Sequence, residues 1–253
     1  MLGAITIINL IWMLGAFQVE QPKEQAPNQE LLSLSEKLLY AVKTDEPVDS
    51  LQSALSKYAV NDLVQGLTND NARKTFWINI YNAYYQILSV REKKTKPKIF
   101  TDKVIRFADA AFSLDAVEHG ILRKYRWKYS LGYLPQFLPS KSIKQLAVTH
   151  IDFRIHFTLN CGAKSCPPIA FYTYDKIETQ LELATGSFLE SETVIDTPNR
   201  TVQVTKIMQW FKGDFKGEKG IRQILSTYLG KDFSTYKIKF REYNWSQDLN
   251  NFK

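Results

Sequence analysis

Both cysteines of this 253-residue chain lie in one short stretch, LNCGAKSCPP, at residues 159–168. A thiol becomes a strong nucleophile when a neighbouring imidazole or helix N-terminus lowers its pKa. Cys161 precedes Gly162, which leaves room for a substrate and for backbone N–H donors to an oxyanion. Cys166 instead precedes two prolines, which have no N–H to donate. Cys161 is therefore the better candidate nucleophile.

A candidate base lies in the segment SLDAVEHGILRKY, where Ser113 is placed to cap a helix. The apolar face of that helix comprises Leu114, Val117, Ile121 and Leu122. Glu118 falls inside this face, and His119 lies at its border. Together with Cys161 they could perform acyl transfer, with His119 as the base and Glu118 orienting it. A structural cluster of buried, hydrogen-bonded polar groups is the alternative for Glu118 and His119.

Cofactor motifs are missing from the chain. It contains no Gly-rich dinucleotide loop, no phosphate-binding loop and no His-Glu-x-x-His helix. The spacing of Cys161 and Cys166 is wide for a zinc knuckle, and the chain has only three histidines. We therefore expect neither a metal nor a cofactor. A disulfide between the two cysteines, structural or cycling with a dithiol, stays open as an alternative to a free nucleophile.

The N-terminus resembles an export signal. Residues 1–18 carry no charged side chain, and their apolar part of about 16 residues is shorter than the ~20 that a membrane-spanning helix needs. We predict a signal peptide at 1–18, a polar linker at 19–29 and a single domain at 30–253. The protein is then periplasmic or extracellular, with no stable membrane span after cleavage, and a retained anchor is the alternative.

Hydrophobic periodicity predicts an α+β domain, in which a helical N-terminal part packs on a small mixed or antiparallel sheet. Helices are expected over 31–42, 47–66, 71–90, 113–125 and 175–190, the last with an Asp175–Glu178 capping box, and two more short ones after 205. Strands are expected over 103–108 and 151–160, in a hairpin at 193–205 and near 236–243.

Several polar residues are expected to surround the reactive thiol. Asn79 and Asn82 interrupt the helix at 71–90, and because buried amides need partners, they should tie down a nearby loop. His156 lies on the polar face of the strand expected at 151–160. The residues predicted to bind substrate or support the site are Asn79, Asn82, Arg123, His156, Asn160, Gly162, Ser165 and Cys166.

The chain is basic, with a formal net charge of +7. This charge favours acidic surroundings such as a membrane face or a cell-envelope polymer. It is dense only at 91–98 and in RKYRWKYS, residues 123–130, where aromatic side chains alternate with cations. That second stretch indicates either a contact surface for an acidic glycan or protein, or an amphipathic edge strand. We do not expect a nucleic-acid partner.

Four segments resemble successive blocks of the family called domain of unknown function 547, over about residues 70–250. They read FWINIYNA, SLDAVEHGILR, RIHFTLNCGAKSCPP and REYNWSQDLN. The resemblance implies a domain of bacterial exported proteins and of larger plant and animal chains, with no established substrate. It implies a core of Asn79, Asn82, Glu118, His119, Arg123, His156, Cys161 and Gly162. In this family the second cysteine position is often serine, so the resemblance implies a role for Cys161 beyond a disulfide.

The leading hypothesis is a thiol-dependent hydrolase or acyltransferase that acts on amide or peptide bonds, loosely similar to papain-like or transglutaminase-like enzymes. Its substrate would be a peptide or a cell-envelope polymer. One alternative is a non-enzymatic binding domain for an acidic glycan or protein. Another is a redox protein in which Cys161 and Cys166 cycle between dithiol and disulfide.

Overall fold

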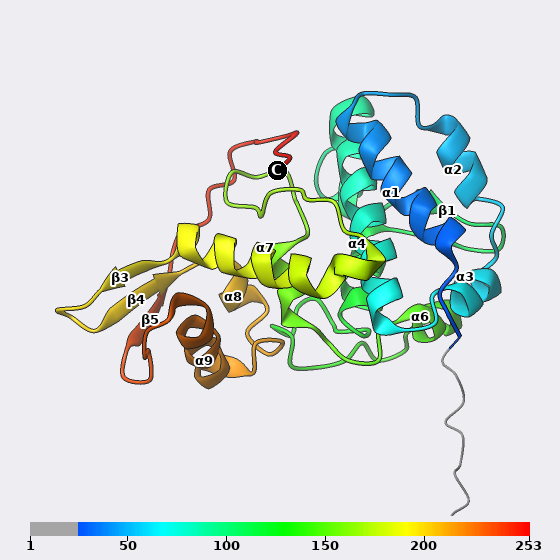
Figure 1. The fold of residues 1–253 in the computed structure, drawn as a ribbon. Coiled ribbons are helices and arrows are strands. Elements are labelled where there is room, and N and C mark those ends of the chain that lie inside the picture. The colour runs from blue at the N-terminus through cyan, green and yellow to red at the C-terminus, as the bar shows by residue number, and fades with distance from the viewer. Residues whose placement is uncertain (1–24) are drawn as a thin grey trace, which may run out of the picture.

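The structure, a computed structural model, describes residues 25–253 (Figure 1). The predicted signal peptide and most of the predicted linker lie outside the described residues. Within residues 25–253, no helix is both long and apolar enough to cross a bilayer. The α-helices are α1 (Gln29–Lys43), α2 (Asp49–Leu55), α3 (Val60–Gly66), α4 (Asp70–Gln86), α5 (Lys98–Thr101), α6 (Lys141–Leu146), α7 (Ile177–Glu192), α8 (Ile207–Trp210) and α9 (Gly217–Leu229).

The helical part is built around α4. From Lys74 to Gln86 every residue of this helix is buried, and α1 packs along it. The chain then continues into a π-helical turn, η1 (Ile87–Arg91), so the helix predicted over 71–90 is confirmed. The helix predicted over 47–66 is instead two helices, α2 and α3. They are separated because the chain turns at Ser56–Ala59, where the Ala59 N–H donates to Asp62 at the start of α3.

Two small sheets complete the α+β fold. Strands β1 (Ile105–Arg106) and β2 (Ala111–Phe112) form an antiparallel pair. Strands β3 (Val194–Asp196), β4 (Thr201–Val204) and β5 (Lys237–Phe240) form a mixed sheet, in which β3 and β4 are antiparallel and β4 and β5 are parallel. The predicted hairpin at 193–205 and the predicted α+β class are confirmed. The papain-like or transglutaminase-like similarity stays a prediction.

Helix α7 joins two hydrophobic cores. Ile177 and Leu181 in its first half belong to the core around α1 and α4. Phe188 and Leu189 in its second half belong to the core beneath the mixed sheet, with α8 and α9. Figure 1 shows α7 crossing from the helical part to the mixed sheet. The N-terminal helices and the C-terminal sheet are therefore connected by one continuous helix.

The strand predicted over 151–160 is wrong. This segment contains a 3₁₀-helix, η3 (Phe153–Phe157), in which the Arg154 N–H is capped by the Asp152 carboxylate. Alternation of apolar and polar residues indicates a strand when one face is exposed. Here His156 and Thr158 are buried along with Ile155, so the alternating polar positions do not mark a solvent face.

The capping box predicted at the start of α7 is also wrong. A 3₁₀ turn, η4 (Tyr174–Lys176), precedes α7. Lys176 is therefore the N-cap residue of α7, and its side chain makes no capping hydrogen bond. The Glu178 carboxylate instead accepts hydrogen bonds from Lys74 and Arg154, at 2.9 and 2.6 Å. Glu178 therefore forms ion pairs with residues distant in the sequence instead of the local capping bond that the Asp175–Glu178 spacing predicted.

Candidate functional site

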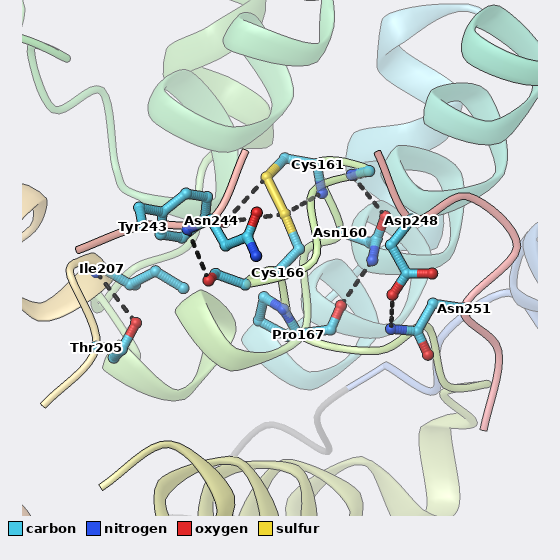
Figure 2. The surroundings of a disulfide bond; sticks show 12 residues. Asn160, Cys161, Cys166, Pro167, Thr205, Ile207, Tyr243, Asn244, Asp248 and Asn251 are labelled. Carbon is cyan, nitrogen blue, oxygen red and sulfur yellow. Dashed lines mark hydrogen bonds between the residues drawn. A yellow bond between two sulfur atoms is a disulfide. The ribbon is translucent and has the colours of Figure 1, made fainter. Parts of the chain in front are cut away.

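Cys161 and Cys166 form a disulfide within the turn that follows η3 (Figure 2). The turn is fixed from inside by Asn160. Its side chain accepts a hydrogen bond from the Gly162 N–H at 2.9 Å and donates one to the Pro167 carbonyl at 2.7 Å. Cys161 is partly exposed, whereas Cys166 is buried. The two sulfurs therefore differ in their access to solvent.

Gly162 has a structural role in this turn. Its φ of +68° lies in the left-handed region, and a Cβ added there would lie 2.5 Å from the hydroxyl oxygen of Tyr85. The turn was expected to offer free backbone N–H donors to an oxyanion, but two of its N–H groups are already bonded within the turn. The Gly162 N–H is bound to Asn160, and the Cys161 N–H donates to the Cys166 sulfur at 3.1 Å.

Tyr243, from the C-terminal part of the chain, packs against the disulfide. Its hydroxyl oxygen lies 3.2 Å from the Cys161 sulfur and 3.0 Å from the Cys166 sulfur (Figure 2). Burial raises the pKa of Tyr243, so this hydroxyl stays protonated at neutral pH. Ser165 fastens the segment that carries Tyr243, since its hydroxyl accepts the Asn244 N–H at 3.0 Å. Ser165 therefore supports the site indirectly, because it positions the segment that carries Tyr243.

The helix that carries Glu118 starts as predicted. The Ser113 hydroxyl accepts the Ala116 N–H at 3.1 Å, and the chain then forms a π-helix, η2 (Ala116–Leu122). The predicted apolar face, comprising Leu114, Val117, Ile121 and Leu122, is fully buried. Glu118 lies beside it, and the Tyr81 hydroxyl donates to its carboxylate at 3.2 Å. Burial raises the pKa of Glu118 to about 7, although nearby Arg123 opposes this shift.

A buried charge network lies behind His119. Arg123 donates to the Asp214 carboxylate at 2.6 Å and to Nδ1 of His119 at 2.8 Å. His156 Nε2 donates to the same carboxylate at 2.8 Å, and its ring stacks on Phe211 with centroids 4.1 Å apart. Burial alone would raise the pKa of Asp214, but the hydrogen bonds from His156 and Arg123 lower it. Asp214 is therefore the anion that balances Arg123.

This network constrains the protonation of His119. Because guanidinium groups only donate, Nδ1 of His119 must accept from Arg123, and the neutral ring carries its proton on Nε2. Burial and the Arg123 charge hold the pKa of His119 well below its usual range. In a thiol–imidazole pair, the ring needs a free lone pair facing the thiol. The hydrogen bonding seen here does not favour His119 as the base for Cys161.

One cavity of about 250 Å³ brings these groups together. Cys161, Glu118 and His119, which the sequence places up to 43 positions apart, all line it, as does His156. The other lining residues are Tyr81, Lys96, Phe100, Asp115, Leu159, Pro167, Ile207, Trp210, Phe211, Tyr243 and Trp245. The cavity is thus a mixed site with a sulfur, a titratable acid and aromatic walls.

Other predicted site residues lie behind the cavity wall. Asn79 bonds the backbone of Tyr172, and Asn82 bonds Thr158 and Asn160, so both tie down loops as expected. The predicted residues that do not line the cavity are Asn79, Asn82, Arg123, Asn160, Gly162, Ser165 and Cys166. Among residues 25–253, no group of three or more His, Cys, Asp or Glu side chains could hold a metal ion.

Sequence reasoning missed Tyr243 and Asp214. Tyr243 lies within the block REYNWSQDLN, so a signal was present but did not single out the tyrosine. Asp214 lies in an unremarkable segment, WFKGDFKG, and is 91 positions from Arg123. Only the fold brings Asp214 to the buried guanidinium, so no local pattern could have identified it.

The family comparison agrees with the motifs. Residues 64–189 match the model described as "Protein of unknown function, DUF547". This part of the chain belongs to that family. The match contains Glu118, His119 and the cysteine turn, and it ends before the block that carries Tyr243. No curated protein and no solved structure matches the chain.

Proposed function

We propose that this chain is an exported thiol–disulfide exchange protein whose reactive centre is the Cys161–Cys166 pair. One observation carries the proposal. The disulfide joins a partly exposed sulfur in the wall of a cavity to a buried sulfur, and the Tyr243 hydroxyl contacts both. An asymmetric pair suits exchange, because one sulfur can be attacked and the other can leave.

The first step is attack by a substrate thiolate on the Cys161 sulfur, which faces the cavity. The Cys161–Cys166 bond breaks, and its electron pair passes to Cys166. The Tyr243 hydroxyl and the Cys161 N–H both donate to the Cys166 sulfur and stabilise this thiolate. Glu118, whose pKa is about 7, can take the proton of the incoming thiol.

The second step releases Cys161 from the mixed disulfide as a free thiolate. A second thiolate of the substrate attacks the substrate sulfur of the mixed disulfide and expels the Cys161 thiolate. The substrate dithiol is thereby oxidised to a disulfide, the protein disulfide is reduced, and the two substrate protons end on the protein thiols. Aromatic side chains such as Trp210 and Trp245 in the cavity wall suit a peptide as the carrier of those thiols.

A thiol-dependent hydrolase or acyltransferase is the second candidate. It is favoured by the fact that Cys161 and Glu118 line the same cavity as His119, as that hypothesis requires. In this case Cys161 attacks a carbonyl only after the disulfide has been reduced. Glu118, with a pKa of about 7, is then the better base, because Nδ1 of His119 is occupied by Arg123. The two candidates differ in whether a reduced Cys161 carries a substrate thiol or an acyl group.

The test is reduction of the native protein. Oxidised protein is incubated with graded dithiothreitol at pH 7 without denaturant, and free thiols are counted by maleimide labelling and intact mass. We expect both thiols to appear while the fold is intact. A disulfide that resists reduction until the protein is unfolded would be purely structural and would refute the proposal.

Two single-cysteine variants identify the attacked sulfur. In Cys166→Ser, Cys161 should form a mixed disulfide rapidly with oxidised glutathione, whereas the matched control Cys161→Ser leaves a buried Cys166 that reacts slowly. Equal rates would contradict the assignment of Cys161. An acyl adduct on Cys161 of the reduced protein, formed with an activated peptide ester, would favour the second candidate.

A further inference from the structure

A loop on the surface gathers an unusual number of apolar side chains. We define the apolar loop as residues 127–138, between η2 and α6. Its exposed large apolar side chains are Trp127, Tyr129, Leu131, Tyr133, Leu134, Phe137 and Leu138. Phe137 is 92% exposed and Leu138 is 76% exposed, and the rest of residues 25–253 holds only six exposed large apolar side chains. A patch of this kind marks an interaction site more often than an ordinary surface.

The backbone of the apolar loop is well defined. The Trp127 N–H donates to the Leu134 carbonyl at 3.0 Å, and the Gly213 N–H donates to the Leu131 carbonyl at 2.7 Å. Leu131 has a φ of +52°, a left-handed conformation that a leucine adopts only when its surroundings impose it. The exposed side chains are therefore held outward by a fixed backbone.

Positive charge surrounds the apolar loop. Residues 119–151 contain no Asp or Glu, and their cations are Arg123, Lys124, Arg126, Lys128, Lys141 and Lys144. Arg123 is buried against Asp214, and Lys128 pairs with Asp115. Lys141 and Lys144 are exposed on α6. Lys103, Arg126 and Lys128 line one open cavity of about 630 Å³, together with Asp115, the partner of Lys128. Trp127, Tyr129 and Leu138 of the apolar loop line the same cavity, so cations and apolar side chains lie close together there.

We propose that the apolar loop docks on the surface of a lipid bilayer that contains acidic lipids. Trp127, Tyr129 and Tyr133 are of the types that concentrate at the level of the lipid headgroups. Phe137 and Leu138 are the most exposed and can enter the acyl boundary. The neighbouring lysines are attracted to acidic headgroups. A protein partner is less favoured, because lysines are depleted from protein interfaces.

Vesicle sedimentation with the full chain tests the proposal. We expect binding to vesicles of phosphatidylcholine with about one third phosphatidylserine, and much weaker binding to pure phosphatidylcholine. The double variant Phe137→Ser/Leu138→Ser should lower the partition coefficient by at least about tenfold. Leu183→Ser on α7, which removes an apolar side chain that is 67% exposed elsewhere, is the matched control and should bind like the wild type.

Quenching by brominated lipids locates the contact. The difference between the wild type and Trp127→Phe isolates the fluorescence of Trp127, which should be quenched in acidic vesicles. An unquenched Trp127, or a double variant that binds as well as the wild type, would overturn the proposal. So would self-association of the wild type that Phe137→Ser/Leu138→Ser abolishes, since the patch would then join two copies of the chain.

Discussion

The cavity has two walls that are built in different ways. On one side, the charged wall, His119 and His156 line the cavity, and behind them Arg123 and Asp214 form an almost completely buried charged network with His156. On the other side, Cys161 and Tyr243 form an uncharged wall held by a covalent bond and by backbone hydrogen bonds. The charged groups are held in place by their ion pairs and hydrogen bonds. The uncharged wall, which we call the sulfur wall, can change because its disulfide can be reduced. In this site the buried charged residues support the cavity, whereas the partly exposed Cys161 is the residue that reacts.

Asp214→Ala is expected to have the largest effect. The substitution leaves the buried Arg123 without its anion, and removing one partner of a buried pair costs about 4 kcal/mol of unfolding free energy. Urea unfolding at pH 7 measures this loss. Glu218→Gln, which breaks a partly exposed pair with Lys212, is the control and should cost less than about 1 kcal/mol. A small loss in Asp214→Ala would show that the charged wall is not held by this network.

Glu118→Gln should change how stability depends on pH. The pKa of Glu118 is about 7 in the folded protein, above its ordinary 4.5, so the folded state binds this proton more tightly than the unfolded state. The resulting stabilisation is complete below about pH 4.5 and is lost as the pH rises through 7. The free energy of unfolding of the variant should exceed that of the wild type by less than about 1 kcal/mol at pH 5 and by about 3 kcal/mol at pH 8.

Urea unfolding of both proteins at pH 5, 6, 7 and 8 gives that difference directly. A difference that does not grow between pH 5 and pH 8 would mean that Glu118 is ionised with an ordinary pKa, and it would remove Glu118 as the group that takes the substrate proton.

Tyr243→Phe should have the smallest effect on stability, but it should clearly slow the reduction of the Cys161–Cys166 disulfide. Loss of one hydrogen bond costs about 1 kcal/mol. Reduction of the disulfide by dithiothreitol should slow by about tenfold, because the Cys166 thiolate loses a donor. Tyr40→Phe, at a tyrosine that is 56% exposed, is the control. An unchanged reduction rate would show that the hydroxyl only fills space.

The sequence predicted those helices in which the positions of the buried residues follow from the periodic spacing of apolar residues. Helix α4 and the helix around η2 were predictable because their large apolar residues recur at helical spacing, although in α4 every residue from Lys74 to Gln86 is buried. Segment 151–160 was not, because His156 is buried by a partner that lies 58 positions away. The placement of Cys161 beside Glu118 was proposed from residue types alone, and the fold was needed to bring both to one cavity.

The order of synthesis has a consequence for the C-terminal segment that carries Tyr243. Residues 244–253 cross the cysteine turn and pair with it at Lys164, Ser165 and Ile169. Every helix and strand of the described domain leaves the ribosome before this segment does. During synthesis, both cysteines are therefore available before Tyr243 is, and the hydroxyl that contacts their two sulfurs is the later part of the site to form.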